Sequence, residues 1–239
     1  MTSGERAAER YHSICEEVGA AERRSGRSSG DVVLIAVSKG HSAESLRAIY
    51  ELGHRDFGES YVQEWQSKRA ILPADIRWHF IGGLQSNKAR LLREVHLVHS
   101  VDRSSVMKRL AGTAVEPVSV LLQVNTGRES QKAVVDPENL VEELDRATGH
   151  EGLRVRGLMA IPPFGLAEQA TREHFSRLSS LHEECRRWLS GRCADRLRDF
   201  QYLSMGMSSD FGTAIEEGAT HVRVGTALFG PRLDVGGAR

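Results

Sequence analysis

The chain has 239 residues with 32 basic and 32 acidic side chains, so its formal net charge at pH 7 is zero. This balance argues against nucleic acid or an anionic membrane as a partner held by bulk electrostatics. The three cysteines, Cys15, Cys185 and Cys193, are too few for a disulfide framework or a zinc site and fit a reducing compartment. No apolar run reaches the roughly 18 residues of a membrane span, and the polar N-terminus lacks the apolar core of a signal peptide. We therefore expect a cytoplasmic protein.

Strand and helix patterns alternate along the chain after residues 1–30, which read as an amphipathic helix and a flexible turn. Strand patterns recur at 31–38, 55–57, 77–81, 96–100, 118–125, 153–159, 200–203 and 221–224. Helical patterns separate them at 43–52, 61–72, 89–95, 106–115, 137–148, 167–189 and 209–217. This order predicts one (β/α)8 TIM-type barrel domain over residues 1–239, with an extra N-terminal helix. An open doubly wound sheet is the alternative, because strands such as 55–57 are short.

Capping residues mark several of the expected helix ends. Ser42 is placed to cap the helix that follows the first strand, and Gly53 to end it. Asp102 or Ser104 would cap the helix at 106–115, and Pro137 suits a first helical turn.

Lys39 stands at the carboxyl end of the first buried strand, where folds of this class place their chemistry. Desolvation there favours the free-base amine, which attacks carbonyls to form a Schiff base. The alternative is a lysine that only extends its ammonium out of the barrel mouth. Only five of the 32 basic residues are Lys, at positions 39, 68, 88, 108 and 132. A chain that otherwise uses Arg has kept Lys at position 39, and of the two only Lys can form an imine.

Two loops rich in glycine and hydroxyl residues follow the last two strands, at 203–210 and 225–230. Backbone N–H groups and hydroxyls in such loops converge on anions, and (β/α)8 barrels commonly bind phosphate at this place. Either loop alone could be ordinary turn chemistry. Both together favour a phosphorylated ligand.

Arg223 lies inside the eighth strand, and a period of two turns it inward together with His221 and Gly225. A buried arginine needs a partner, which is either an internal carboxylate or the ring nitrogen of a planar cofactor. Barrel closure would place the eighth strand beside the first, which carries Lys39. An imine-forming lysine, a phosphate cradle and a buried arginine together suggest pyridoxal 5′-phosphate (PLP).

The sequence resembles the pyridoxal phosphate homeostasis family, whose fold is similar to the N-terminal barrel of alanine racemase. The resemblance rests on AVSKG (36–40), FGESYVQEWQSK (57–68), WHFIGGLQSNK (78–88), HSVD (99–102), QVNTGRESQK (123–132), RGLMAIPP (156–163) and the long block at 203–232. It implies that Lys39 carries PLP as a Schiff base and that Arg223 faces the pyridine nitrogen. An arginine there would keep that nitrogen largely unprotonated, which makes the ring a weak electron sink. The resemblance also implies a set of residues that hold the phosphate or line the cofactor: Val37, Ser60, Ser204, Gly206, Met207, Ser208, Gly225 and Thr226.

The chain departs from the family pattern at two positions. Ser60 stands where the family usually has an asparagine beside the cofactor, and it lacks the second donor of an amide. Val134 replaces a glycine that the family places two residues after Lys132, a lysine often proposed as a second reactive amine. We expect PLP still to bind, with altered ring contacts.

Other polar residues have simpler interpretations. A packed, hydrogen-bonded interior position is expected for His79. We interpret Glu59 and Glu64 as charges at a helix N-terminus and on the surface, and Cys185 and Cys193 as inert.

The favoured function is a PLP-binding protein that acts in vitamin B6 and amino-acid homeostasis with little or no catalysis, with PLP-dependent apoenzymes as recipients. The alternative is a PLP-dependent amino-acid racemase, which needs an acid or base on each face of the substrate. In alanine racemase one such group comes from a separate C-terminal domain of the partner subunit, and no such domain is recognised here. A monomer is expected for the same reason. A cofactor-free Schiff-base aldolase would fit Lys39 and the phosphate loops but leaves Arg223 unexplained.

Overall fold

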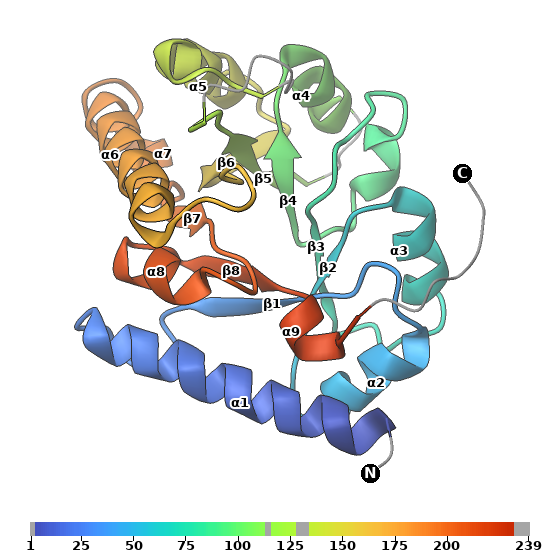
Figure 1. Cartoon of the computed structure of the whole chain (residues 1–239). Coiled ribbons are helices and arrows are strands. Elements are labelled where there is room, and N and C mark those ends of the chain that lie inside the picture. Colours follow the sequence, from blue (N-terminus) through green and yellow to red (C-terminus); the bar gives the residue numbers. More distant parts are fainter. Residues whose placement is uncertain (1–2, 113–115, 128–133, 232–239) are drawn as a thin grey trace.

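A computed structural model describes residues 3–112, 116–127 and 134–231. Eight parallel strands follow one another around a closed barrel, and β1 pairs with both β2 and β8 (Figure 1). The strands are β1 (Val33–Val37), β2 (Asp56–Glu59), β3 (Arg77–Phe80), β4 (Leu97–Val101), β5 (Val118–Gln123), β6 (Leu153–Met159), β7 (Tyr202–Ser204) and β8 (His221–Val224). The pairing of β1 with β8 confirms the predicted barrel and excludes the open sheet.

Helices surround the barrel on the outside (Figure 1). They are α1 (Ser3–Arg24), α2 (Ala43–Glu51), α3 (Val62–Arg69), α4 (Ser104–Ala111), α5 (Leu140–Thr148), α6 (Glu168–Arg192), α7 (Ala194–Leu197), α8 (Phe211–Glu216) and α9 (Thr226–Phe229), with 3-10 helices η1 (Ala89–Leu92) and η2 (Pro137–Asn139). The extra N-terminal helix α1 packs against α2, α8 and α9, outside the seam where β8 meets β1. That position buries its apolar stripe, which includes Ile14, Val18 and Ala21.

Strand residues alternate between two cores. Leu34, Ala36 and Phe57 belong to the large apolar core that includes the surrounding helices. Leu97, Leu121 and Met159 form a second, small cluster, and the rest of the barrel interior is largely polar. The barrel interior is therefore where buried chemistry is to be sought.

The capping predictions have mixed outcomes. The hydroxyl of Ser42 accepts a hydrogen bond from the Ser45 amide and caps α2, and Gly53 follows that helix with a φ of 94°. The cap expected from Asp102 or Ser104 is wrong, because Arg103 occupies the cap position of α4 without a side-chain bond and Asp102 pairs with Arg103 instead.

One expected helix is shorter and tighter than the pattern suggested. The segment 89–95 forms only η1, in which the buried residues Ala89 and Leu92 share one face at the three-residue period of a 3-10 helix. The last three residues of the helix expected at 106–115 lie outside the described residues.

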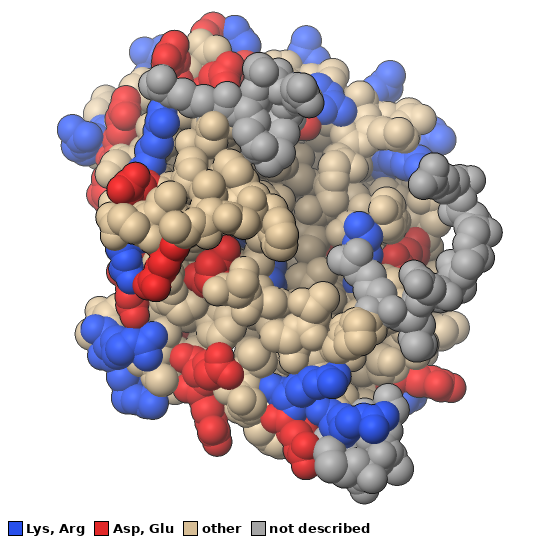
Figure 2. All heavy atoms as spheres, in the orientation of Figure 1, with Lys and Arg blue, Asp and Glu red and all other residues tan. Residues whose placement is uncertain are grey.

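Acidic and basic side chains are interspersed over the face seen in Figure 2, and neither sign gathers there into one patch. None of the helices in the described ranges is long and apolar enough to cross a membrane.

Candidate functional site at the β1–β8 seam

The predicted site residues lie at the carboxyl ends of β1, β2, β7 and β8, which parallel strands bring to the same rim of the barrel. Val37 ends β1, Ser60 follows β2, and the loop after β7 holds Gly206, Met207 and Ser208. Gly225 and Thr226 follow β8, so the sequence positions that lie furthest apart are neighbours across the seam. Lys132, the proposed second amine, lies outside the described residues.

Lys39 occupies the turn after β1 and is half-buried. Its Nζ lies 4.7 Å from the centroid of the Tyr61 ring. Within the described part of the chain, no carboxylate lies within 4.0 Å of this nitrogen. The next residue, Gly40, has a φ of 74°, a conformation that glycine adopts without strain. Lys39 is thus an amine held in a tight turn, and none of the described carboxylates forms an ion pair with it.

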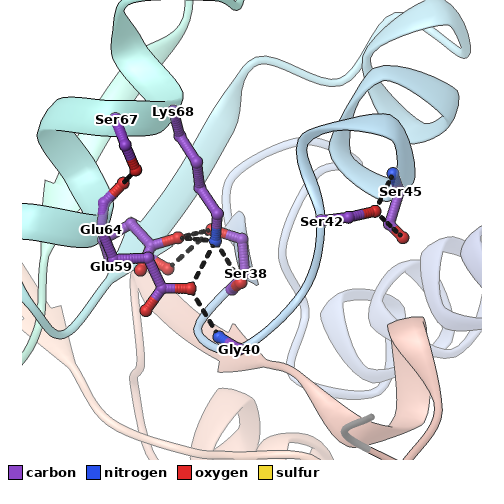
Figure 3. A network of polar contacts seen from close by, with 9 residues as sticks. Ser38, Gly40, Ser42, Ser45, Glu59, Glu64, Ser67 and Lys68 are labelled. Atoms are coloured by element: carbon purple, nitrogen blue, oxygen red, sulfur yellow. Dashed lines mark hydrogen bonds and ion pairs between the residues drawn. The ribbon is translucent and has the colours of Figure 1, made fainter. Parts of the chain in front are cut away.

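The turn that carries Lys39 is bound to an ion cluster formed by the buried Glu59 and Lys68 and the partly exposed Glu64 (Figure 3). Lys68 Nζ lies 2.5 Å from Glu59 Oε1 and 2.7 Å from Glu64 Oε1, and the Glu59 side chain is fully buried. The interpretation of Glu59 as a helix-end or surface charge is therefore wrong, whereas Glu64 lies in the first turn of α3 and stays partly exposed, as expected. Strand β2 extends two residues further than expected, which places Glu59 under α3 and opposite Lys68.

The loops after β7 and β8 meet at the hydroxyl of Ser208. Its Oγ lies 3.3 Å from the amide of Gly225 and 3.5 Å from that of Ala227, and the Thr226 hydroxyl donates to it at 3.4 Å. These are long hydrogen bonds, so the two amides remain good donors for a stronger acceptor. A Cβ on Gly206 would lie 2.6 Å from the Ala214 Cβ, so this close approach needs glycine.

Arg223 points into the barrel and is only 4% exposed. Its Nη1 donates to Ser204 Oγ at 2.6 Å and its Nη2 to the Ala160 carbonyl at 3.0 Å. No described carboxylate lies within salt-bridge distance, so the internal ion pair considered for Arg223 is not formed. Burial lowers the pKa of Arg223 to about 10, which still leaves the guanidinium protonated at neutral pH.

Ser204 is not brought to the phosphate loops. Strand β7 continues through this residue, so its side chain turns into the barrel, where it is fully buried. Besides accepting from Arg223, its Oγ lies 2.8 Å from His99 Nδ1. Ser204 is therefore a hydrogen-bond partner of Arg223 inside the barrel. Of the two serines predicted to hold the phosphate, only Ser208 contacts the loop after β8.

A chain of hydrogen bonds continues from Ser204 across the barrel interior. His99 Nε2 lies 3.0 Å from His79 Nδ1, and His79 Nε2 lies 3.0 Å from Asp56 Oδ1. Because Asp56 accepts, His79 donates from Nε2, His99 donates from Nε2 to His79, and the Ser204 hydroxyl donates to His99. Every hydrogen bond of this chain has one donor and one acceptor when both histidines are neutral. Burial favours the same neutral state, because it lowers the pKa of His79 and of His99.

Asp56 anchors the far end of this chain. Burial opposes its ionisation, but hydrogen bonds from His79 and Arg77 outweigh burial and lower the pKa of Asp56. The expectation of a packed, hydrogen-bonded His79 is confirmed, whereas His99 and Asp56 were not predicted from the sequence. The available sequence signal for His99 and Asp56 was the period of two along their strands, which turns both side chains into the barrel.

The donor set at the seam fits a phosphorylated aldehyde that has a ring nitrogen. Lys39 offers a primary amine, and the Gly225 and Ala227 amides offer donors for an anion. Arg223 uses two of its five N–H donors on protein oxygens and stays cationic. An imine-forming amine, an anion cradle and a donor for a ring acceptor are the groups that PLP requires.

The model of the alanine racemase N-terminal domain family matches residues 21–232. This match assigns the chain to the class of proteins built on that barrel. A curated relative from Pseudomonas aeruginosa, a pyridoxal phosphate homeostasis protein, is 41% identical over 231 residues, which cover 94% of this chain and 95% of the relative. The chain therefore belongs to the pyridoxal phosphate homeostasis protein family.

Solved structures agree with the fold. PipY from Synechococcus elongatus, with PLP bound, superposes with a TM-score of 0.76 at 39% identity and covers 91% of this chain and 100% of its own. Alanine racemase from Corynebacterium glutamicum superposes with a TM-score of 0.64 at 17% identity, over 94% of this chain and 62% of its own. At that identity the second likeness shows the fold alone.

Proposed function

We propose that this protein binds PLP through an imine bond to Lys39 and acts in vitamin B6 and amino-acid homeostasis with little catalysis of its own. The observation that carries the proposal is the meeting of three groups at one seam: the Lys39 amine, the Ser208–Gly225 anion cradle and the Arg223 guanidinium. The names of the relatives and the PLP bound in PipY support it.

Each group would have a separate task. The Lys39 nitrogen would join the aldehyde, while the amides of Gly225 and Ala227 and the hydroxyl of Ser208 would hold the phosphate. The rest of the cofactor site would be lined by Val37, Ser60, Gly206 and Met207. Arg223 would donate to the ring nitrogen, and since it is itself protonated it would keep that nitrogen unprotonated. PLP bound in this way is a poor electron sink, which suits storage and transfer better than general amino-acid chemistry.

The racemase alternative is not favoured. Racemisation through two bases needs an acid or base on each face of the substrate. The likeness to alanine racemase reaches only the level of the fold, whereas the relative that covers nearly the whole chain is a homeostasis protein.

The wider setting is part of the same proposal. We place the protein in the cytoplasm, as a monomer in which residues 1–239 act as one domain, with PLP-dependent apoenzymes as recipients. The three cysteines are free, as a reducing compartment would have them. A groove of about 710 Å³ adjoins the phosphate loop, and Phe164 on its wall is 97% exposed, which offers a recipient a contact beside the cofactor.

Titration of the purified protein with PLP, and in parallel with pyridoxal, tests the proposal. We expect a visible imine band with PLP at micromolar concentrations, and weaker binding of pyridoxal, because it lacks the phosphate. A protein that forms no band with excess PLP would contradict the proposed function.

Replacing Ser208 by alanine should weaken PLP binding roughly tenfold, because one hydrogen bond to a charged group is lost. Binding of pyridoxal, which has no phosphate, should change little. The neighbouring exposed Ser209 provides the matched control, since Ser209→Ala leaves the cradle intact. Equal losses for PLP and pyridoxal would show that Ser208 does not contact the phosphate.

A further inference from the structure

The ion cluster beside Lys39 uses all three hydrogens of one buried ammonium. Lys68 Nζ donates to Glu59 Oε1, to Glu64 Oε1 at 2.7 Å and to the Ser38 carbonyl at 2.7 Å (Figure 3). The Lys68 side chain is only 7% exposed. An ammonium with every donor engaged offers no lone pair, so Lys68 is not a second amine for the cofactor.

The same cluster holds the backbone on both sides of Lys39. Before it, the Ser38 carbonyl accepts from Lys68, and the Ser38 hydroxyl donates to Glu59 Oε1 at 2.6 Å. After it, the Gly40 amide donates to Glu64 Oε1 at 2.7 Å. Lys39 itself contacts none of the three charges, because its Nζ lies over Tyr61. The cluster therefore fixes where the Lys39 side chain begins without binding its amine.

We propose that Glu59, Glu64 and Lys68 are positioning residues that hold the Lys39 turn so that its amine meets the aldehyde of the bound cofactor. This inference rests on the proposed function and deepens it. The inference assigns a role to three residues that belong neither to the Ser208–Gly225 anion cradle nor to the hydrogen-bond chain that begins at Arg223.

Stability alone does not account for the cluster. The Glu59 carboxylate and the Lys68 ammonium are withdrawn from water, the Glu64 side chain is 23% exposed, and Glu59 Oε2 has no hydrogen-bond partner within the described residues. Burial raises the pKa of Glu59, which expresses the same desolvation penalty. Apolar side chains of similar volume usually stabilise a fold as well as a buried ion cluster or better. Apolar side chains, however, cannot form the hydrogen bonds that hold the Ser38 carbonyl and the Gly40 amide in place.

The test uses the double variant Lys68→Met/Glu59→Gln, because Lys68→Met alone would leave two carboxylates without their cation. We expect a midpoint of unfolding close to that of the wild type. The rate of imine formation with PLP should fall roughly 10- to 100-fold, as for a misplaced reacting group. Affinity for pyridoxamine 5′-phosphate, which has no aldehyde, should stay within about twofold when measured by calorimetry, because the cradle and Arg223 are untouched.

A second variant, Glu64→Ala, removes the acceptor of the Gly40 amide and one of the three acceptors of Lys68, and leaves the Lys68–Glu59 pair and the Ser38 contact in place. Hydrogen exchange of that amide should accelerate without any cofactor present, and imine formation should slow as well. Arg69→Met is the matched control, since Arg69 lies on the same helix in an exposed ion pair with Glu94 and should change neither readout.

The outcomes separate the two proposals. A wild-type protein that forms no imine would overturn the proposed function and this inference with it. Normal imine formation in both the wild type and the double variant would overturn this inference alone. Parallel losses of imine rate, pyridoxamine phosphate affinity and thermal stability would also overturn it, because they would show that the cluster only supports the fold.

Discussion

Replacement of Lys39 by alanine is expected to abolish the imine absorption completely while the barrel stays folded. Among the lysines at 39, 68, 88 and 108, Lys39 is the one that combines a place at the β1–β8 rim with an amine that none of the described carboxylates holds. Alanine cannot form the covalent bond at any cofactor concentration. The half-buried side chain contributes little to the apolar core, so unfolding should be almost unchanged.

Weak, non-covalent binding of PLP should survive in this variant, because the Ser208–Gly225 cradle and Arg223 remain. Absorption spectroscopy and calorimetry on the same sample measure the two contributions separately. Lys108→Ala, an exposed change on α4, serves as the control and should retain the full band. An imine band in Lys39→Ala would show that another amine carries the cofactor.

Acid should unfold this protein steeply, because the barrel interior holds histidines that are neutral only while folded. Burial lowers the pKa of His79 and His99, and lowers that of His221 to about 3. An unfolded histidine titrates near pH 6.5, so below that pH the unfolded chain binds more protons than the native one. Stability therefore rises with pH up to about 6.5 and is flat above it, as far as these groups are concerned. A histidine that stays neutral in the folded state contributes about 1.4 kcal/mol per pH unit, so the slope near pH 5 reaches at most about 4 kcal/mol per unit for the three together.

Urea unfolding between pH 4.5 and 8 measures this slope directly. His99→Gln should reduce it by about one proton, roughly 1.4 kcal/mol per pH unit. His12→Gln, an exposed change on α1, should leave it unchanged. A free energy of unfolding that does not vary between pH 5 and 6.5 would contradict the assignment of neutral buried histidines.

The rim of the site could be predicted because it depends on local pattern. Two patterns can be read from the sequence without knowledge of the tertiary fold. One is the run of buried strand residues that ends at Lys39, and the other is the period of two that turns Arg223 inward. Parallel strands then place their carboxyl ends together, which brought the lysine, the arginine and the loops at Ser208 and Gly225 to one seam.

The polar interior could not be predicted in the same way. The bond between His99 and Ser204 joins residues 105 positions apart, and its existence depends on β7 continuing for one residue beyond the expected end. Because β7 includes this additional residue, the Ser204 side chain points into the barrel and binds Arg223, whereas the sequence predicted that it would hold the phosphate. Likewise Glu59 was expected at a helix start, and two more strand residues brought it under α3. The i, i+4 spacing of Glu64 and Lys68 was visible in the sequence, but the burial of that pair was not.

Borohydride reduction of the PLP-loaded protein, followed by peptide mapping, tests the central claim most directly. Reduction fixes an imine as a stable secondary amine on the lysine that carried it. We predict a single modified peptide in which the pyridoxyl group sits on Lys39, with Lys68 unmodified. A label on another lysine, or no label in a protein that has been given excess PLP, would contradict the claim that Lys39 is the residue that holds the cofactor.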